Sequence, residues 1–155
     1  MPLEDPQIIT REAVPTAVVR AENLPMADLP TFYDGAYGTV SEALAAQGAR
    51  PTGAAFGLYL VPPSETFTLE VGFPVSAPIT SDGEVHASQL PAGEVVRATH
   101  AGGYDGLPDS WGALMAWVGE QGRTPGLLWE VYVTDPSPEM DPATLRTDLF
   151  VQLTD

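Results

Sequence analysis

The sequence predicts an α+β domain built from two β-α-β-β repeats. Three observations predict this fold class: short segments recur in the same order in both halves, helix and strand patterns alternate, and turn residues separate them. The length of 155 residues is that of one domain. We therefore expect residues 1–155 to form a single domain, with pseudo-repeats over about residues 7–77 and 84–153.

Four pairs of segments indicate the duplication. The second member of each pair follows the first by 73 to 78 residues, as in 95 − 18 = 77 for the first pair. Four matches in the same order argue for duplication, whereas chance supplies one or two. The pairs are residues 18–21 with 95–98, 47–48 with 121–122, 58–60 with 131–133, and 68–71 with 146–149.

The first repeat reads as strand, helix, strand, strand. Residues 8–21 have strand composition and contain Pro15, and residues 54–61 and 66–75 read as two strands joined by a hairpin-type connection at 62–65. Between them, Gly48 ends a helix whose apolar residues fall at i, i+4 and i+7 spacing. These residues are Leu29, Tyr33, Ala36, Val40 and Leu44.

The second repeat has the same order. Residues 84–100 read as one strand, bent near 91–93, and residues 127–134 and 144–153 read as the closing strands around a Pro-rich loop. The helix has Pro108 in its first turn and Gly122 past its end. Its apolar stripe consists of Leu107, Trp111, Leu114 and Val118. Residues 79–83 read as the joint between the repeats.

The charge of the chain argues against several classes of partner. Six basic and 21 acidic residues give a net charge of −15, which repels phosphate backbones, so we expect no direct nucleic-acid binding. No apolar run is long enough to span a membrane, and the acidic start does not resemble a signal peptide. The absence of cysteine is compatible with the cytoplasm, where we expect the protein. An arginine-only, lysine-free composition hints at a bacterial source.

Most catalytic and cofactor signatures are missing. His86 and His100 lack ligand-type spacing, and with no cysteine we expect no metal site. There is no Gly-x-Ser-x-Gly elbow, no triad-like order of serine and histidine, and no phosphate loop. We therefore expect no cofactor.

The second half carries a pattern that resembles the GyrI-like domain, which is also the effector-binding half of AraC-type and MerR-type bacterial regulators. The pattern comprises Gly-Gly-Tyr-Asp at 102–105, Leu-Pro at 107–108, Trp111, Trp117 and Trp-Glu-Val-Tyr-Val-Thr-Asp-Pro at 129–136. The resemblance implies a concave antiparallel sheet with two helices and a central pocket. Lacking a helix-turn-helix before its first strand, the chain resembles stand-alone members.

The resemblance also implies a ligand site. In the family, a buried glutamate and nearby aromatic residues bind hydrophobic, often cationic or aromatic molecules, and by likeness these are Glu130 and Tyr132. The candidate ligand-binding residues also include Tyr59, Trp111, Tyr37 and Phe56. In the repeats, Tyr59 matches Tyr132, Tyr37 matches Trp111, and Phe56 matches Trp129. Glu130 matches Gly57, so the repeats differ in chemistry there.

Strand alternation predicts that Glu130 and Tyr132 share one face, with Trp129, Val131 and Val133 on the other. A buried carboxylate is costly unless it is paired. Either Glu130 pairs with an internal arginine such as Arg20 or Arg97, or it faces a pocket. For the tyrosines the alternative to a ligand role is core packing.

Three functions remain open. The first is binding of a hydrophobic, aromatic or cationic small molecule, for drug or effector sensing or for sequestration. The second is a hydrolase of reactive cyclopropane-bearing or similar toxic compounds, as the resemblance implies for some stand-alone members, with Glu130 and Tyr132 as catalytic residues that activate water. The third is interaction with DNA gyrase, because the family's namesake inhibits that enzyme. Whether a protein partner exists is open.

Overall fold

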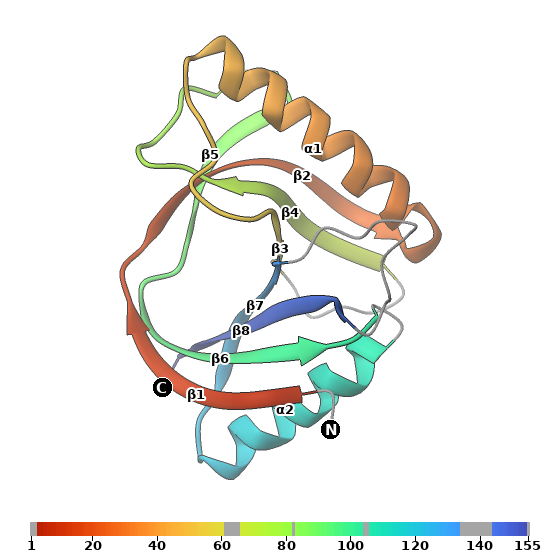
Figure 1. Cartoon of the computed structure of the whole chain (residues 1–155), viewed down its shortest axis with the longest axis vertical. Coiled ribbons are helices and arrows are strands. Elements are labelled where there is room, and N and C mark those ends of the chain that lie inside the picture. Colours follow the sequence, from red (N-terminus) through yellow and green to blue (C-terminus); the bar gives the residue numbers. More distant parts are fainter. Residues whose placement is uncertain (1–2, 61–65, 82, 104–105, 134–143, 155) are drawn as a thin grey trace. The chain divides into compact units, whose positions relative to one another are not determined.

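The computed structural model describes residues 3–60, 66–81, 83–103, 106–133 and 144–154. Their strands pair in antiparallel fashion and two α-helices accompany them, which confirms the predicted α+β class (Figure 1). The chain divides into two compact units. We call residues 12–92 the α1 unit and residues 1–11 with 93–155 the α2 unit. No helix in the described ranges is both long and apolar enough to cross a membrane.

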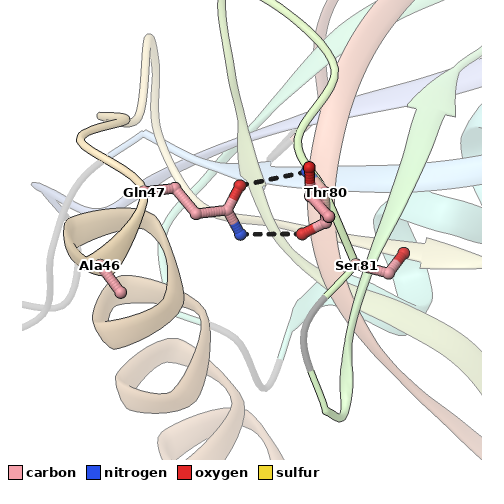
Figure 2. Close-up of a pocket in the computed structure, with 4 residues that line it drawn as sticks. All are labelled: Ala46, Gln47, Thr80 and Ser81. Carbon is pink, nitrogen blue, oxygen red and sulfur yellow. Dashed lines mark hydrogen bonds between the residues drawn. The ribbon is translucent and has the colours of Figure 1, made fainter.

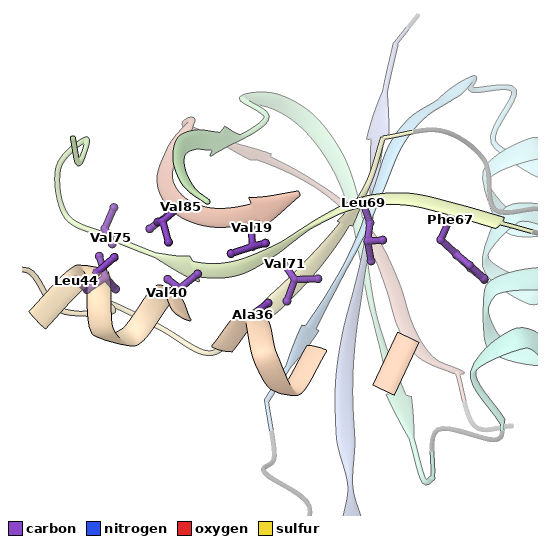
Figure 3. Packing of buried hydrophobic residues seen from close by; sticks show 11 residues of the cluster. Val19, Ala36, Val40, Leu44, Phe67, Leu69, Val71, Val75 and Val85 are labelled. Carbon is purple, nitrogen blue, oxygen red and sulfur yellow. The ribbon is translucent and has the colours of Figure 1, made fainter. Parts of the chain in front are cut away.

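In the α1 unit, helix α1 covers one face of a four-stranded sheet. The strands lie in the order β3 (Phe56–Tyr59), β4 (Thr66–Pro74), β2 (Val14–Pro25) and β5 (Val85–Leu90). Helix α1 (Leu29–Ala46) follows a short 3-10 helix, η1 (Met26–Asp28), and buries Ala36, Val40 and Leu44 against that sheet (Figure 3). The buried face of the sheet includes Val19 and Val71.

The α2 unit repeats this arrangement. Its strands lie in the order β1 (Leu3–Arg11), β6 (Gly93–Ala101), β8 (Arg146–Leu153) and β7 (Pro125–Tyr132). Helix α2 (Leu107–Glu120) buries Leu114 and Val118 against Val96 and Leu149 of the sheet. The helix buries its apolar stripe against the apolar face of the sheet, so both surfaces are removed from water.

The two helices agree with the predicted apolar stripes, and they end alike. Gly48 and Gly122 follow the helices at matched positions and have φ angles of 69° and 70°. This left-handed conformation suits glycine, because it has no Cβ atom. The Gln-Gly pair that recurs in the sequence therefore marks the C-terminus of the helix in each repeat.

The strands at the start of each repeat differ from the prediction. Residues 8–21 and 84–100 were expected to form one strand each, but each range contains two strands, β1 with β2 and β5 with β6. The two members of each pair have different partners. Strand β1 pairs with β6 in the α2 unit, and β5 pairs with β2 in the α1 unit. The first strand of each repeat thus lies in the unit that contains the other repeat's helix.

The pairing registers support the duplication and correct one match. Gly57 lies opposite Val71 in the α1 unit, and Glu130 lies opposite Leu149 in the α2 unit. The matched residues differ in number by 130 − 57 = 73 on one strand and by 149 − 71 = 78 on the other, and both values equal the predicted offsets. Val71 also lies opposite Val19, whereas Leu149 lies opposite Ala98. The offset of β6 is therefore 98 − 19 = 79, and the predicted value of 77 is wrong. A two-residue shift keeps every side chain on the same face, so alternation does not reveal it.

Several sequence predictions lie outside the described residues. These are the connection at 62–65, the whole Pro-rich loop at 135–142, and residues 104–105 and 134–136 of the family pattern. The predicted central pocket stays a prediction.

Candidate functional site

A buried carboxylate lies on the helix-covered face of β7. Glu130 is 4% exposed, and both of its oxygens accept hydrogen bonds from aromatic side chains. Trp111 Nε1 donates to Oε2 over 2.7 Å, and the Tyr132 hydroxyl donates to Oε1 over 2.8 Å. Hydrogen bonds to a charged acceptor are short and strong, so these two donors fix the plane of the carboxylate.

Local structure explains why these three residues meet. Glu130 and Tyr132 are two residues apart on one strand, so their side chains leave the same face. Trp111 lies on the apolar stripe of α2, which packs on that face. The predicted shared face of Glu130 and Tyr132 agrees with this geometry, while a ligand-binding or catalytic role for the three stays a prediction.

The two arginines that the sequence offered as partners of Glu130 have ion pairs elsewhere. Arg20 lies 3.2 Å from Glu22, and Arg97 lies 3.2 Å from Asp148. The contacts of Glu130 described above instead come from neutral donors.

The other three candidate residues belong to the α1 unit. Tyr59 lies on the helix-covered face of β3 and its ring is 6.1 Å from that of Phe67. Tyr37 lies on α1 with its ring 5.7 Å from that of Phe73. Phe56 is buried and lies opposite Gly72, three residues before Tyr59, so it leaves the other face of the strand.

Sequence analysis missed a buried pair of serine and histidine in the α2 unit. His100 Nδ1 lies 2.6 Å from Ser110 Oγ, and Nε2 lies 2.8 Å from the carbonyl oxygen of Gly103. A carbonyl only accepts, so Nε2 carries the proton and Nδ1 accepts from Ser110. Both residues are 1% exposed, so the pair joins β6 to the first turn of α2, next to Trp111. Ten residues separate the partners and no motif connects them, so only the fold reveals the contact.

Thr147 is a second residue that sequence analysis missed. It is 0% exposed, and its Oγ1 has no hydrogen-bond partner in the described part of the chain. Thr147 lies opposite Tyr132 on β7 and opposite His100 on β6. The repeats held a signal, because the matched residue is the apolar Leu69, at an offset of 147 − 69 = 78.

The opposite face of β7 carries an aromatic stack. The Trp129 ring lies parallel to that of Phe150 at 5.1 Å, and the Arg11 guanidinium lies 5.7 Å and 5.2 Å from the two ring centres. Burial, and secondarily the charge of Arg97, lower the pKa of Arg11 below its ordinary value. Arginine remains charged at neutral pH despite such a shift, so this side chain contributes a cation–π contact.

A surface hollow of about 590 Å³ lies at the end of α1, lined by Ala46, Gln47, Thr80 and Ser81 (Figure 2). The Gln47 amide donates to the Thr80 carbonyl over 2.8 Å and accepts from the Thr80 amide over 3.1 Å. The Gln47 side chain therefore satisfies both backbone groups of Thr80, which lies in the joint between the repeats, in the way that a paired strand satisfies backbone groups. None of these four described residues is charged or aromatic, so they do not offer the chemistry of the Glu130 site.

The sequence model of the GyrI-like small molecule binding domain matches residues 4–154. No curated protein sequence is significantly similar to the chain.

Solved structures share the fold. The C-terminal domain of EcmrR has a TM-score of 0.83 at 18% identity, covering 97% of both chains. EcmrR in a DNA complex gives 0.83 at 19% identity, covering 99% of this chain, which spans only 58% of that protein. A hydrolase from Listeria innocua gives 0.66 at 13% identity over 99% and 94% of the two chains. SAV2435 bound to tetraphenylphosphonium gives 0.67 at 7% identity over 97% and 94%.

Proposed function

Because this chain belongs to the GyrI-like small molecule binding domain family, we propose that it binds a hydrophobic, aromatic or cationic small molecule at Glu130. The observation that carries the proposal is the buried carboxylate held between an indole and a phenol. Such binding serves drug or effector sensing, or sequestration of the ligand. Family membership supports small-molecule binding in general, and the chemistry of this site supports the class of ligand.

Two physical effects favour a cationic aromatic ligand. A carboxylate removed from water attracts a cation more strongly than an exposed one does, since the local dielectric is lower. Trp111 and Tyr132 are partly exposed and adjoin the carboxylate, so their rings offer cation–π and stacking contacts. The complex of SAV2435 with tetraphenylphosphonium shows that one protein of this fold takes such a ligand.

Titration calorimetry with tetraphenylphosphonium tests the proposal. The variant Glu130→Gln keeps the shape of the side chain and removes its charge, so we expect binding to weaken at least about tenfold, as loss of a desolvated charge pair does. Glu94→Gln is the matched control, because Glu94 is 51% exposed and pairs with Arg123 on the surface. Equal affinities for wild type and Glu130→Gln would show that Glu130 is not the site.

Hydrolysis of a reactive small molecule, such as a cyclopropane-bearing toxin, is the second candidate function. The 2.8 Å contact between the Tyr132 hydroxyl and Glu130 favours it, because a carboxylate coupled to a phenol can orient and deprotonate water. The fold shared with a Listeria innocua hydrolase adds support at the level of fold. Turnover that disappears in Glu130→Gln and falls in Tyr132→Phe supports hydrolysis; a ligand recovered unchanged from saturating enzyme supports binding alone.

We infer that the protein is cytoplasmic and that this chain makes no direct contact with nucleic acid. The absence of cysteine supports the first inference and the net charge of −15 supports the second. DNA binding measured at low salt tests the second inference, because non-specific electrostatic binding is strongest there.

A further inference from the structure

We propose that Thr147 forms a hydrogen-bonding subsite beside Glu130, so that the site prefers aromatic amines carrying N–H groups over cations that lack them. The inference rests on the proposed function and goes further by naming a second polar contact and the ligand chemistry that it selects. It is carried by a buried hydroxyl that has no partner in the described residues and lies in the same cross-strand row as Tyr132.

The pairing register places Thr147 next to the carboxylate. Thr147 lies directly opposite Tyr132, and Leu149, two residues further along β8, lies opposite Glu130. Directly opposed side chains have Cβ atoms about 4.5–5.5 Å apart, and diagonal neighbours such as Thr147 and Glu130 about 7–8 Å apart. At these separations, a small polar group of a ligand held between Thr147 and Glu130 would be within hydrogen-bonding reach of both side chains.

The neighbours of Thr147 do not satisfy its hydroxyl. His100 lies opposite on the other side, but its two ring nitrogens contact Ser110 and the Gly103 carbonyl. Buried polar groups in native proteins nearly always have a partner, so an exception calls for an explanation. Packing of the core does not explain why this residue is a threonine. The matched residue of the first repeat, Leu69, fills the same position with a fully buried apolar side chain.

The chemistry of the two acceptors sets the ligand class. An ammonium group has up to three N–H donors, so it can donate to the Glu130 carboxylate and to Thr147 Oγ1 at once. A quaternary ammonium or phosphonium has the same charge and no donor. It would satisfy the carboxylate electrostatically and leave the threonine hydroxyl without a partner. A site that contains an unsatisfied hydrogen-bonding group rejects ligands that cannot pair with it.

A matched pair of ligands tests the inference: naphthylmethylammonium and its N,N,N-trimethyl derivative, which share charge and aromatic body. We expect wild type to bind the ammonium more tightly. In Thr147→Val, which keeps the shape and loses the hydroxyl, the ammonium should bind on the order of tenfold more weakly, while the trimethyl compound changes less than twofold. Thr147→Ser, which retains a hydroxyl, should keep the preference.

The outcomes separate this inference from the proposed function. Equal effects of Thr147→Val on both ligands, no effect on either, or a wild-type preference for the trimethyl compound would overturn the subsite. Weakening of both ligands in Glu130→Gln supports the proposed function even then. If Glu130→Gln changes neither ligand, or wild type binds neither, both inferences fail. Should Thr147→Val not fold, Thr147→Ser against Thr147→Ala gives the same contrast.

Discussion

Glu130 in β7 occupies the position that Gly57 occupies in β3. Gly57 lies opposite Val71 and Glu130 lies opposite Leu149, each on the helix-covered face of its unit, and the four strands of each unit have the matching order. The α1 unit is built with no side chain at this position, so packing of the scaffold does not require a carboxylate there. Burial of a carboxylate carries a desolvation cost, and the proposed ligand site would give a reason for Glu130 at this position.

Removal of the indole donor should weaken the site without removing an aromatic ring. In Trp111→Phe we expect unfolding to require about 1–3 kcal/mol less free energy, because the carboxylate loses a hydrogen bond, and we expect tetraphenylphosphonium to bind more weakly. Urea unfolding and calorimetry measure the two effects. Trp117→Phe is the control, because Trp117 packs on the same core, whereas the indole hydrogen bond to Glu130 comes from Trp111. Equal losses of affinity in both variants would contradict the assignment.

A methyl group at Gly72 should disrupt the α1 unit. An added Cβ would overlap the backbone carbonyl of Ala17 and approach the Cα of Val18 to 2.9 Å, and backbone atoms of a paired strand cannot move aside. We expect Gly72→Ala to cost several kcal/mol of unfolding free energy or to prevent folding. By contrast, Gly38→Ala in α1 meets no atom within 4 Å and should stabilise by up to about 1 kcal/mol. Thermal denaturation distinguishes the opposite signs.

The Ser110–His100 contact should stabilise the first turn of α2. Ser110→Ala leaves a buried ring nitrogen without its donor, so we expect a loss of about 1–3 kcal/mol in unfolding free energy. Ser88→Ala, which removes a part-buried hydrogen bond to Glu70, should cost less. Chemical denaturation of both variants provides the comparison. A cost for Ser110→Ala no larger than that for Ser88→Ala would show that the histidine contact contributes little.

The Gln47 side chain should protect the joint between the repeats from local opening. Gln47→Ala removes both hydrogen bonds to the Thr80 backbone, so amide exchange at Thr80 should accelerate. Gln121→Ala alters the matched residue of the second repeat, which makes no such contact in the described residues. Global stability should change by under about 1 kcal/mol, because these contacts are exposed. Unchanged exchange at Thr80 in Gln47→Ala would refute the role.

Sequence patterns predicted the features that depend on the spacing of apolar residues and on the residues that end helices. The apolar spacing from Leu29 to Leu44 and the terminal Gly48 and Gly122 suffice to place both helices, because helix faces and left-handed ends require particular residues. Alternation placed Glu130 and Tyr132 on one face. The family pattern pointed to Trp111, and the structure places its indole on that carboxylate.

The features that the sequence did not predict depend on which segments pair or pack together in the fold. The break between β1 and β2 follows from a change of partner strand, and the two-residue error in the match of β6 preserves alternation, so neither alters the local pattern. The contact of Ser110 with His100 and the unsatisfied hydroxyl of Thr147 arise between elements. Such features have no spacing rule, and only the pairing of strands reveals them.

The placement of β1 and β5 has a consequence for the history of the chain. One repeat alone cannot complete its own four-stranded sheet, because the outer strand next to β2 comes from the second repeat and the one next to β6 comes from the first. An ancestral single repeat would have completed its sheet by exchanging that strand with a second copy, as a domain-swapped homodimer does. In this chain the two repeats are covalently joined, so the exchange of strands is intramolecular and the two halves can carry different side chains at matched positions.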